Sequence, residues 1–154
     1  MTETVIMPPA GGGLARRRRH PLTLIPLLVI PWLFYNIFAF TIFGGQPSGW
    51  ATQLFQIRMV SGTEWSLTWG DLMLLVGIIA LFFEVLKSTN TGRSSLVEHM
   101  LSTVLFIVFL VEFILFGAAA SSTFFLLMAM SLVDVVAGFS ISITGAGRDV
   151  TMEN

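Results

Sequence analysis

Four long apolar runs set the strongest limit on the architecture of this chain. Each holds about 20 mostly apolar residues, which as a helix suffice to cross the ~30 Å hydrocarbon core of a bilayer. Only 11% of the 154 residues are charged, against about 25% in a soluble domain. The sequence therefore predicts an all-α membrane protein whose four transmembrane helices form an antiparallel bundle. The runs are 22–43, 67–87, 96–117 and 123–143.

The segments that flank this 22–143 domain are predicted to be tails. Residues 1–21 contain Pro8-Pro9 and a run of three glycines, so we expect a disordered, basic segment. Residues 144–154 form the second tail. Four arginines directly before the first run are typical of a cytoplasmic membrane anchor, although a nucleic-acid patch has a similar composition. The net charge of −1 gives no support to nucleic-acid binding. The anchoring residues are Arg16, Arg17, Arg18 and Arg19.

The distribution of Lys and Arg predicts the orientation. If the N-terminus is cytoplasmic, the far side of the membrane holds only Arg58. This bias predicts that both termini lie in the cytoplasm. Three tryptophans near the outer boundary are expected to anchor the chain at the membrane surface. They are Trp50, Trp65 and Trp69.

The outer loop, 44–70, has the alternating pattern of a β-hairpin. Phe55, Ile57 and Met59 share one strand face, and Trp65, Leu67 and Trp69 share a face of the second. These two sets lie on the same face of the sheet only if an odd number of residues connects the strands, so we expect three or five turn residues. A hairpin alone is marginal in water, and its apolar face should rest on the membrane surface or on the helix ends. We expect a structural lid, and the alternative is a binding role through an open strand edge.

Local signals refine the helix ends. Ser95 and Glu98 have the spacing of a capping box for the third helix. Pro21 suits the first turn of the first helix, whereas Pro26 and Pro31 are expected inside it, where they should kink it.

Acidic residues inside the runs are the main candidates for function, because a charge within a bilayer is costly and should face protein or water. Glu84 lies near the cytoplasmic face, Glu112 nearer the outer face and Asp134 near the midplane, so we expect three separate levels. Tyr35 and Asn36 could supply partners to Asp134 or Glu112.

At the inner level, Glu84 can meet Lys87, Glu98 and His99 if the second and third helices are neighbours. Two interpretations are open. One is a proton-handling site, because histidine beside carboxylates titrates near neutrality. The other is a salt-bridge cluster that locks helices together.

Small and polar residues form a stripe around Asp134 at helical spacing. Ser131, Gly138 and Ser142 share its face, and Gly77 and Ala80 share a face with Glu84 on the second helix. Small residues let helices approach closely, so we expect these residues to mediate helix packing.

No catalytic, cofactor or metal site is predicted. The chain has no Cys, no G-x-S-x-G, no H-E-x-x-H and no P-loop. One His with two Glu is a weak metal signal, and neither histidine has the depth expected of a haem ligand.

Several short segments are similar to a known group. They are W-G-D-L-M-L-L-V-G (69–77), F-F-E-V-L-K-S-T-N-T-G-R (82–93), V-E-H-M-L-S (97–102), S-T-F-F-L-L (122–127) and L-V-D-V-V-A-G-F (132–139). Over about residues 50–143 the chain resembles small four-helix inner-membrane proteins of bacteria, chiefly alphaproteobacteria, that carry no assigned function. The resemblance implies a multi-pass protein of the inner (plasma) membrane and transfers no site residue.

We therefore expect an accessory or scaffolding subunit, not an enzyme, that binds the lipid bilayer and another integral membrane protein or a second copy of itself. The alternative is a small proton- or solute-translocating protein that uses Asp134, Glu84 and Glu112.

Overall fold

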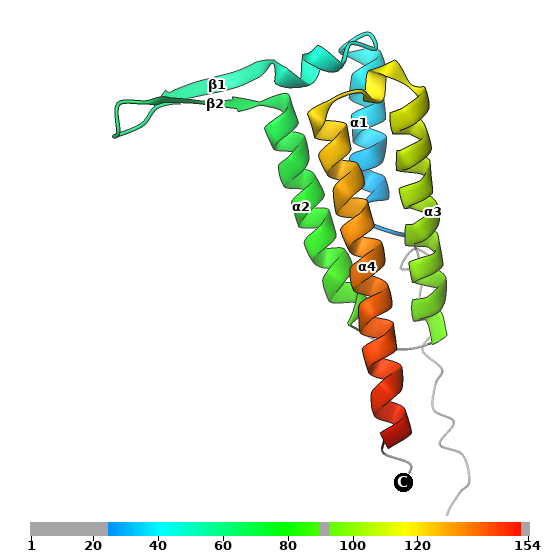
Figure 1. The fold of residues 1–154 in the computed structure, drawn as a ribbon. Helices are drawn as coiled ribbons and strands as arrows, with labels where there is room; N and C mark the ends of the chain where they lie inside the picture. The colour runs from blue at the N-terminus through cyan, green and yellow to red at the C-terminus, as the bar shows by residue number, and fades with distance from the viewer. Residues whose placement is uncertain (1–24, 90–92, 152–154) are drawn as a thin grey trace, which may run out of the picture.

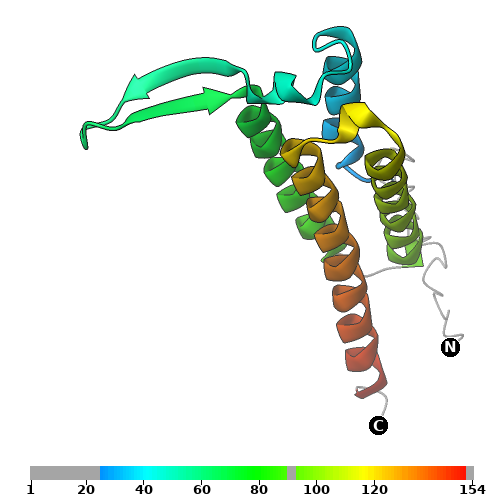
Figure 2. The same ribbon diagram turned by 45° about the horizontal axis from the view of Figure 1, so that its top comes forward.

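The structure, a computed structural model, describes residues 25–89 and 93–151, with side chains described over 25–89 and 97–144. Four helices form an antiparallel bundle, and a two-stranded hairpin leaves one end of it (Figures 1 and 2). We call this the hairpin end. The helices are α1 (Val29–Thr41), α2 (Trp69–Ser88), α3 (Arg93–Leu115) and α4 (Ser122–Thr151). The strands are β1 (Gln53–Arg58) and β2 (Glu64–Thr68), and the short 3-10 helices are η2 (Pro47–Ala51) and η3 (Gly117–Ala119).

Three segments of the described chain are long and apolar enough to cross a membrane: Trp69–Ser88, Val97–Leu115 and Ser122–Thr144. They belong to α2, α3 and α4. Helix α4 lies between α2 and α3 and packs against both, and α1 lies behind them (Figure 1). The chain is therefore a mostly helical protein with three candidate membrane spans.

Helix α1 is shorter than the sequence predicts, because it begins at Val29 rather than at residue 22. The predicted kink is also wrong. Pro26 precedes the helix and Pro31 lies in its first turn, where backbone N–H groups have no partner within the helix. Proline therefore marks the start of α1 instead of bending it. Pro21 lies outside the described residues.

The ends of the other helices also differ from expectation. Helix α4 continues to Thr151, into the segment that we expected to be a tail, and α3 already includes Arg93. The side chain of Ser95, in the predicted capping box, lies outside the described side chains. A capping box that we did not predict begins α2, where Thr68 Oγ1 accepts from the Asp71 backbone N–H at 3.1 Å and Asp71 Oδ2 accepts from the Thr68 N–H at 2.9 Å.

The hairpin and its register are confirmed. Five residues connect Arg58 to Glu64, and Ile57 pairs with Trp65 as Phe55 pairs with Leu67. Phe55, Ile57, Trp65 and Leu67 therefore share one face of the sheet, whereas Met59 lies beyond β1 and Trp69 begins α2. Gly62, with φ of 85°, provides the left-handed position that the turn needs.

The hairpin projects sideways from the start of α2, away from the other helices (Figures 1 and 2). The apolar side chains of Phe55, Ile57, Met59 and Trp65 are 46–53% exposed. The expectation that this face rests on the helix ends is therefore wrong, and the alternative that it lies on the membrane surface stays a prediction.

The core of the hairpin half is aromatic. Tyr35 stacks on Trp50 with ring centroids 4.4 Å apart and planes at 12°, and it meets Phe124 edge to face at 4.7 Å. The Tyr35 hydroxyl donates to the Ala118 carbonyl at 2.9 Å and lies 2.7 Å from Ser121 Oγ. This cluster joins α1, η2, η3 and the start of α4.

Candidate functional site

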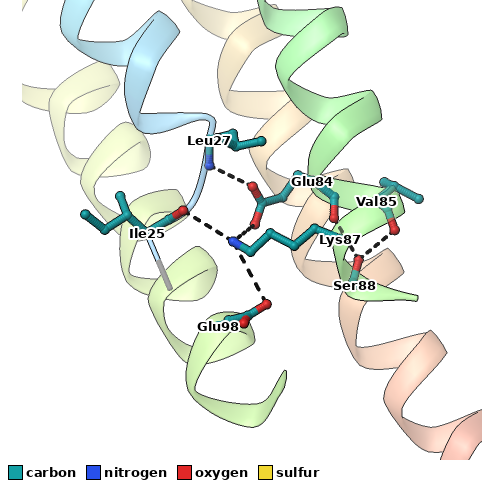
Figure 3. A network of polar contacts seen from close by, with 7 residues as sticks. All are labelled: Ile25, Leu27, Glu84, Val85, Lys87, Ser88 and Glu98. Atoms are coloured by element: carbon teal, nitrogen blue, oxygen red, sulfur yellow. Dashed lines mark hydrogen bonds and ion pairs between the residues drawn. The ribbon is translucent and has the colours of Figure 1, made fainter. Parts of the chain in front are cut away.

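A buried polar cluster lies between the helices at the end opposite the hairpin (Figure 3). Glu84 Oε2 accepts a hydrogen bond from the backbone N–H of Leu27 at 2.7 Å. Lys87 Nζ lies 3.1 Å from Glu84 Oε1 and donates to the Ile25 carbonyl at 3.3 Å. Both residues of α2 therefore bind the backbone of the segment that leads into α1.

Helix α3 adds Glu98 and His99 to this cluster, and both side chains are buried. Glu98 Oε2 lies 3.9 Å from Lys87 Nζ, across the gap between α3 and α2. The second oxygen, Oε1, is buried without a hydrogen-bond partner among the described residues. The His99 ring lies 5.9 Å from the ring of Phe139 on α4.

Helix α4 contributes Asp134, which is also buried. Its carboxylate accepts a hydrogen bond from the Ser102 side chain of α3 and interacts electrostatically with Glu84 and Lys87. Asp134 therefore lies within electrostatic range of Glu84 and Lys87. The expectation of three separate levels of acidic residues stays a prediction.

The charges of this cluster do not balance in number. Among the described side chains, the carboxyl groups of Glu84 and Glu98 lie 3.1 and 3.9 Å from the ammonium group of Lys87, and that of Asp134 interacts with it electrostatically. Among the described side chains, those of 25–89 and 97–144, no three His, Cys, Asp or Glu residues are grouped so that they could hold a metal ion. What the arrangement can do chemically is bind protons and tie α2, α3, α4 and the start of α1 together.

The second acidic group lies nearer the hairpin end. Glu112 Oε2 accepts a hydrogen bond from the indole N–H of Trp32 at 2.6 Å, and the Asn36 side chain is a further hydrogen-bond partner. The prediction that Asn36 could serve Glu112 agrees with this geometry. Tyr35 instead binds Ala118 and Ser121.

Glu112 lines a groove of about 420 Å³ between α1 and α3. Apart from Asn36, the remainder of its wall is apolar and aromatic. Helices α1 and α3 make little direct contact along it, because α1 packs mainly on α2. The lining residues include Trp32, Asn36 and Phe40 of α1 and Ile107, Val111 and Glu112 of α3.

An apolar layer separates the two acidic groups. Phe109 of α3, between Ser102 and Glu112 in the chain, is completely buried, as are Phe124 and Leu127 of α4. Phe109 and Phe124 lie 5.3 Å apart between ring centroids. These three side chains carry no charge that could link the groups.

The predicted packing residues face neighbouring helices. Gly77 and Ala80 are buried, and a Cβ at Gly77 would lie 2.6 Å from Leu127 Cδ2. A Cβ at Gly138 would overlap the His99 ring. Ser131 is buried, but its hydroxyl binds the Met128 carbonyl of its own helix. Ser142 is half-buried.

The three tryptophans occupy different environments. Trp50 is 2% exposed and belongs to the core, so its predicted role as a membrane anchor is wrong. Trp69 is half-buried against Phe38, at 5.3 Å between ring centroids. Only Trp65 is strongly exposed, on the hairpin. Arg16, Arg17, Arg18 and Arg19 lie outside the described residues.

Three partners at these sites were not predicted from the sequence. Trp32 binds Glu112, and the backbones of Ile25 and Leu27 bind Lys87 and Glu84. No sequence pattern signals a side chain that binds a distant backbone group. The capping box of α2, in contrast, could have been predicted from the T-x-x-D spacing of Thr68 and Asp71.

Comparisons with protein-family models, curated proteins and solved structures found no match for this chain. The resemblance to bacterial inner-membrane proteins therefore stays a prediction.

Proposed function

We propose that this chain is a subunit that binds another integral membrane protein, with the β-hairpin as its docking element. The observation that carries this proposal is the uncovered apolar face of the hairpin, where Phe55, Ile57, Met59 and Trp65 are about half exposed. Exposed apolar surface beyond the membrane-spanning helices is typical of a binding site.

The size of the hairpin supports the same proposal. Two strands without further packing are marginally stable in water, so β1 and β2 gain stability when a partner covers their apolar face. Within the described part of the chain, both outer strand edges are free to pair with an extended segment of another chain. A hollow of about 690 Å³ next to the hairpin, bordered by Thr68, Asp71 and Ser121, extends this surface toward the bundle.

The proposal includes a fourth membrane crossing. Ile25 and Leu27 lie against Lys87 and Glu84, near the end of α2 opposite the hairpin. Residues 25–41 therefore cover most of the depth of the bundle although α1 has only 13 residues. With four crossings, both termini lie on one side, and the excess of Lys and Arg there makes this side the cytoplasm, at the inner membrane of a bacterium.

Purification of the tagged chain in a mild detergent tests the proposal. We expect one stoichiometric membrane-protein partner, lost in the triple variant Phe55→Ser, Ile57→Ser and Trp65→Ser. The matched control is Gln56→Ala with Ser66→Ala, a cross-strand pair on the opposite face. A chain that purifies alone, or a partner that both variants retain, would contradict the hairpin role.

Proton binding at the polar cluster is a second candidate, favoured by three carboxyl groups that interact with one lysine. Asp134→Asn in liposomes tests it, because an isosteric amide cannot release a proton. Proton flux that depends on the chain and disappears in this variant would support the candidate, and unchanged flux would exclude the use of Asp134. The apolar layer of Phe109, Phe124 and Leu127 favours a packing role for the cluster over a continuous route.

A further inference from the structure

We propose that the groove between α1 and α3 binds a transmembrane helix of a partner protein that carries a Lys or Arg near its hairpin-side end, and that Glu112 pairs with this cation. This inference rests on the proposed function and specifies the chemistry of the partner.

The groove has the shape for an elongated apolar occupant. Its wall runs from Trp32 to Phe40 along α1, which at 1.5 Å per residue is about 12 Å. Ile107 and Val111 continue it along α3. This length corresponds to about two turns of a helix, so a partner can insert side chains spaced i and i+4.

The polar part of the wall is arranged for an ionised carboxylate. The Trp32 indole N–H donates to Glu112 Oε2, and the side chain of Asn36 also hydrogen-bonds to Glu112. Two neutral donors compensate only part of the cost of an anion in an apolar groove. A cation in the groove would supply the missing charge, and the face of Trp32 would favour it further.

The described chain does not bring a cation of its own to Glu112. Lys87 is bound to Glu84 at the opposite end of the bundle, and Arg58 lies in β1, on the projecting hairpin. In a second copy, the three candidate membrane spans, Trp69–Ser88, Val97–Leu115 and Ser122–Thr144, hold Lys87 as their one Lys or Arg, at the end of α2 opposite the hairpin. The charge complement is therefore expected from a different protein.

The depth of Glu112 indicates where the partner carries its basic residue. Glu112 lies three residues before Leu115, the last residue of α3, which is about 4.5 Å along the axis. A Lys or Arg about one turn from the end of a transmembrane helix reaches this depth at low cost, because its stem lies in the apolar region and its head near the interface.

Binding of designed transmembrane peptides to the full chain in lipid vesicles tests the inference. The probe is a Leu-Ala helix with one Lys about one turn from each end, and its control has Leu at both positions. Fluorescence energy transfer between peptide and chain reports binding. We expect the Lys peptide to bind about tenfold more tightly than the control, and Glu112→Gln to abolish the difference.

A second pair of variants tests the groove itself. Val108→Phe narrows it and should weaken binding of the Lys peptide, whereas Val136→Phe on the exposed face of α4 should not. Equal binding of both peptides to the wild-type chain, or a Lys preference that survives Glu112→Gln, would overturn the inference.

The two proposals can fail separately. If binding of a native partner requires the hairpin but not Glu112, the inference about the groove is wrong and the proposed function stands. Peptide binding that depends on Glu112, with no native partner recovered, would keep the groove and contradict the proposed function.

Discussion

The carboxylate of Glu84 accepts a hydrogen bond from the backbone N–H of Leu27 at 2.7 Å, across 57 residues of chain. Leu27 directly precedes the N-cap of α1, so the anion of α2 lies at the positive end of the α1 dipole. Because Lys87 binds the Ile25 carbonyl and approaches Glu98 as well, this contact fixes the start of α1 to both α2 and α3.

Loss of the Glu84 carboxylate should destabilise the bundle strongly. Glu84→Ala leaves the Leu27 N–H without its acceptor and Lys87 without its nearest carboxylate, at a cost of about 3 kcal/mol. Glu84→Gln keeps an acceptor for Leu27 and should cost about 1 kcal/mol. Unfolding in detergent micelles measures both. Glu64→Ala, on the exposed hairpin, is the control, and equal midpoints for all three variants would contradict the role of Glu84.

Substitution of Trp50 and of Trp65 by alanine should lower the stability of the bundle by very different amounts, although both residues were expected at the membrane surface. Trp50→Ala removes the ring that stacks on Tyr35 and should cost about 3–5 kcal/mol of bundle stability. Trp65→Ala removes an exposed ring on the hairpin and should cost less than about 1 kcal/mol. Thermal unfolding of the two variants in the same detergent tests this order, which a common membrane-anchoring role would not produce.

Gly138 should tolerate no side chain, because a Cβ there overlaps the ring of His99. Gly138→Ala should therefore cost about 1–3 kcal/mol, as expected for overpacking between helices. The matched control is Gly117→Ala, whose Cβ would have no neighbour within 4 Å and should change stability by about 0.5 kcal/mol or less. Comparable losses in both variants would show that close packing of α3 and α4 at Gly138 is not the cause.

The absence of cysteine makes the membrane topology directly testable. Single variants Ala10→Cys, Ser61→Cys and Met152→Cys can be treated with a membrane-impermeant maleimide on intact cells. The proposed topology predicts labelling of Ser61→Cys alone, and labelling of the other two after permeabilisation. Labelling of both Ala10→Cys and Ser61→Cys on intact cells would show that residues 25–41 do not cross the membrane.

The features that the sequence predicts well are those set by local periodicity. The hairpin register follows from the alternation of Phe55 and Ile57 opposite Trp65, since a shift of one residue would turn every side chain to the other face. The three long helices follow from the length of their apolar runs.

The features that the sequence does not predict depend on how the helices are placed against each other. Trp50 has the pattern of an interfacial residue, and only its stacking on Tyr35 places it in the core. Asp134 interacts electrostatically with Glu84 and Lys87 because α4 packs against α2, and Glu112 faces a groove that side chains of both α1 and α3 line. These relationships depend on tertiary packing, which periodicity within one helix does not encode.

The most direct test of the central claim, that the apolar face of the hairpin binds another membrane protein, is photo-crosslinking in the native membrane. A photoreactive benzoylphenylalanine is placed at Phe55, Ile57 or Trp65 on the apolar face, and at Gln56 or Ser66 on the opposite face. The account predicts that the first three positions crosslink to one and the same membrane protein and that the other two do not. Crosslinks from the apolar face to lipid alone, or equal protein crosslinks from both faces, would contradict it.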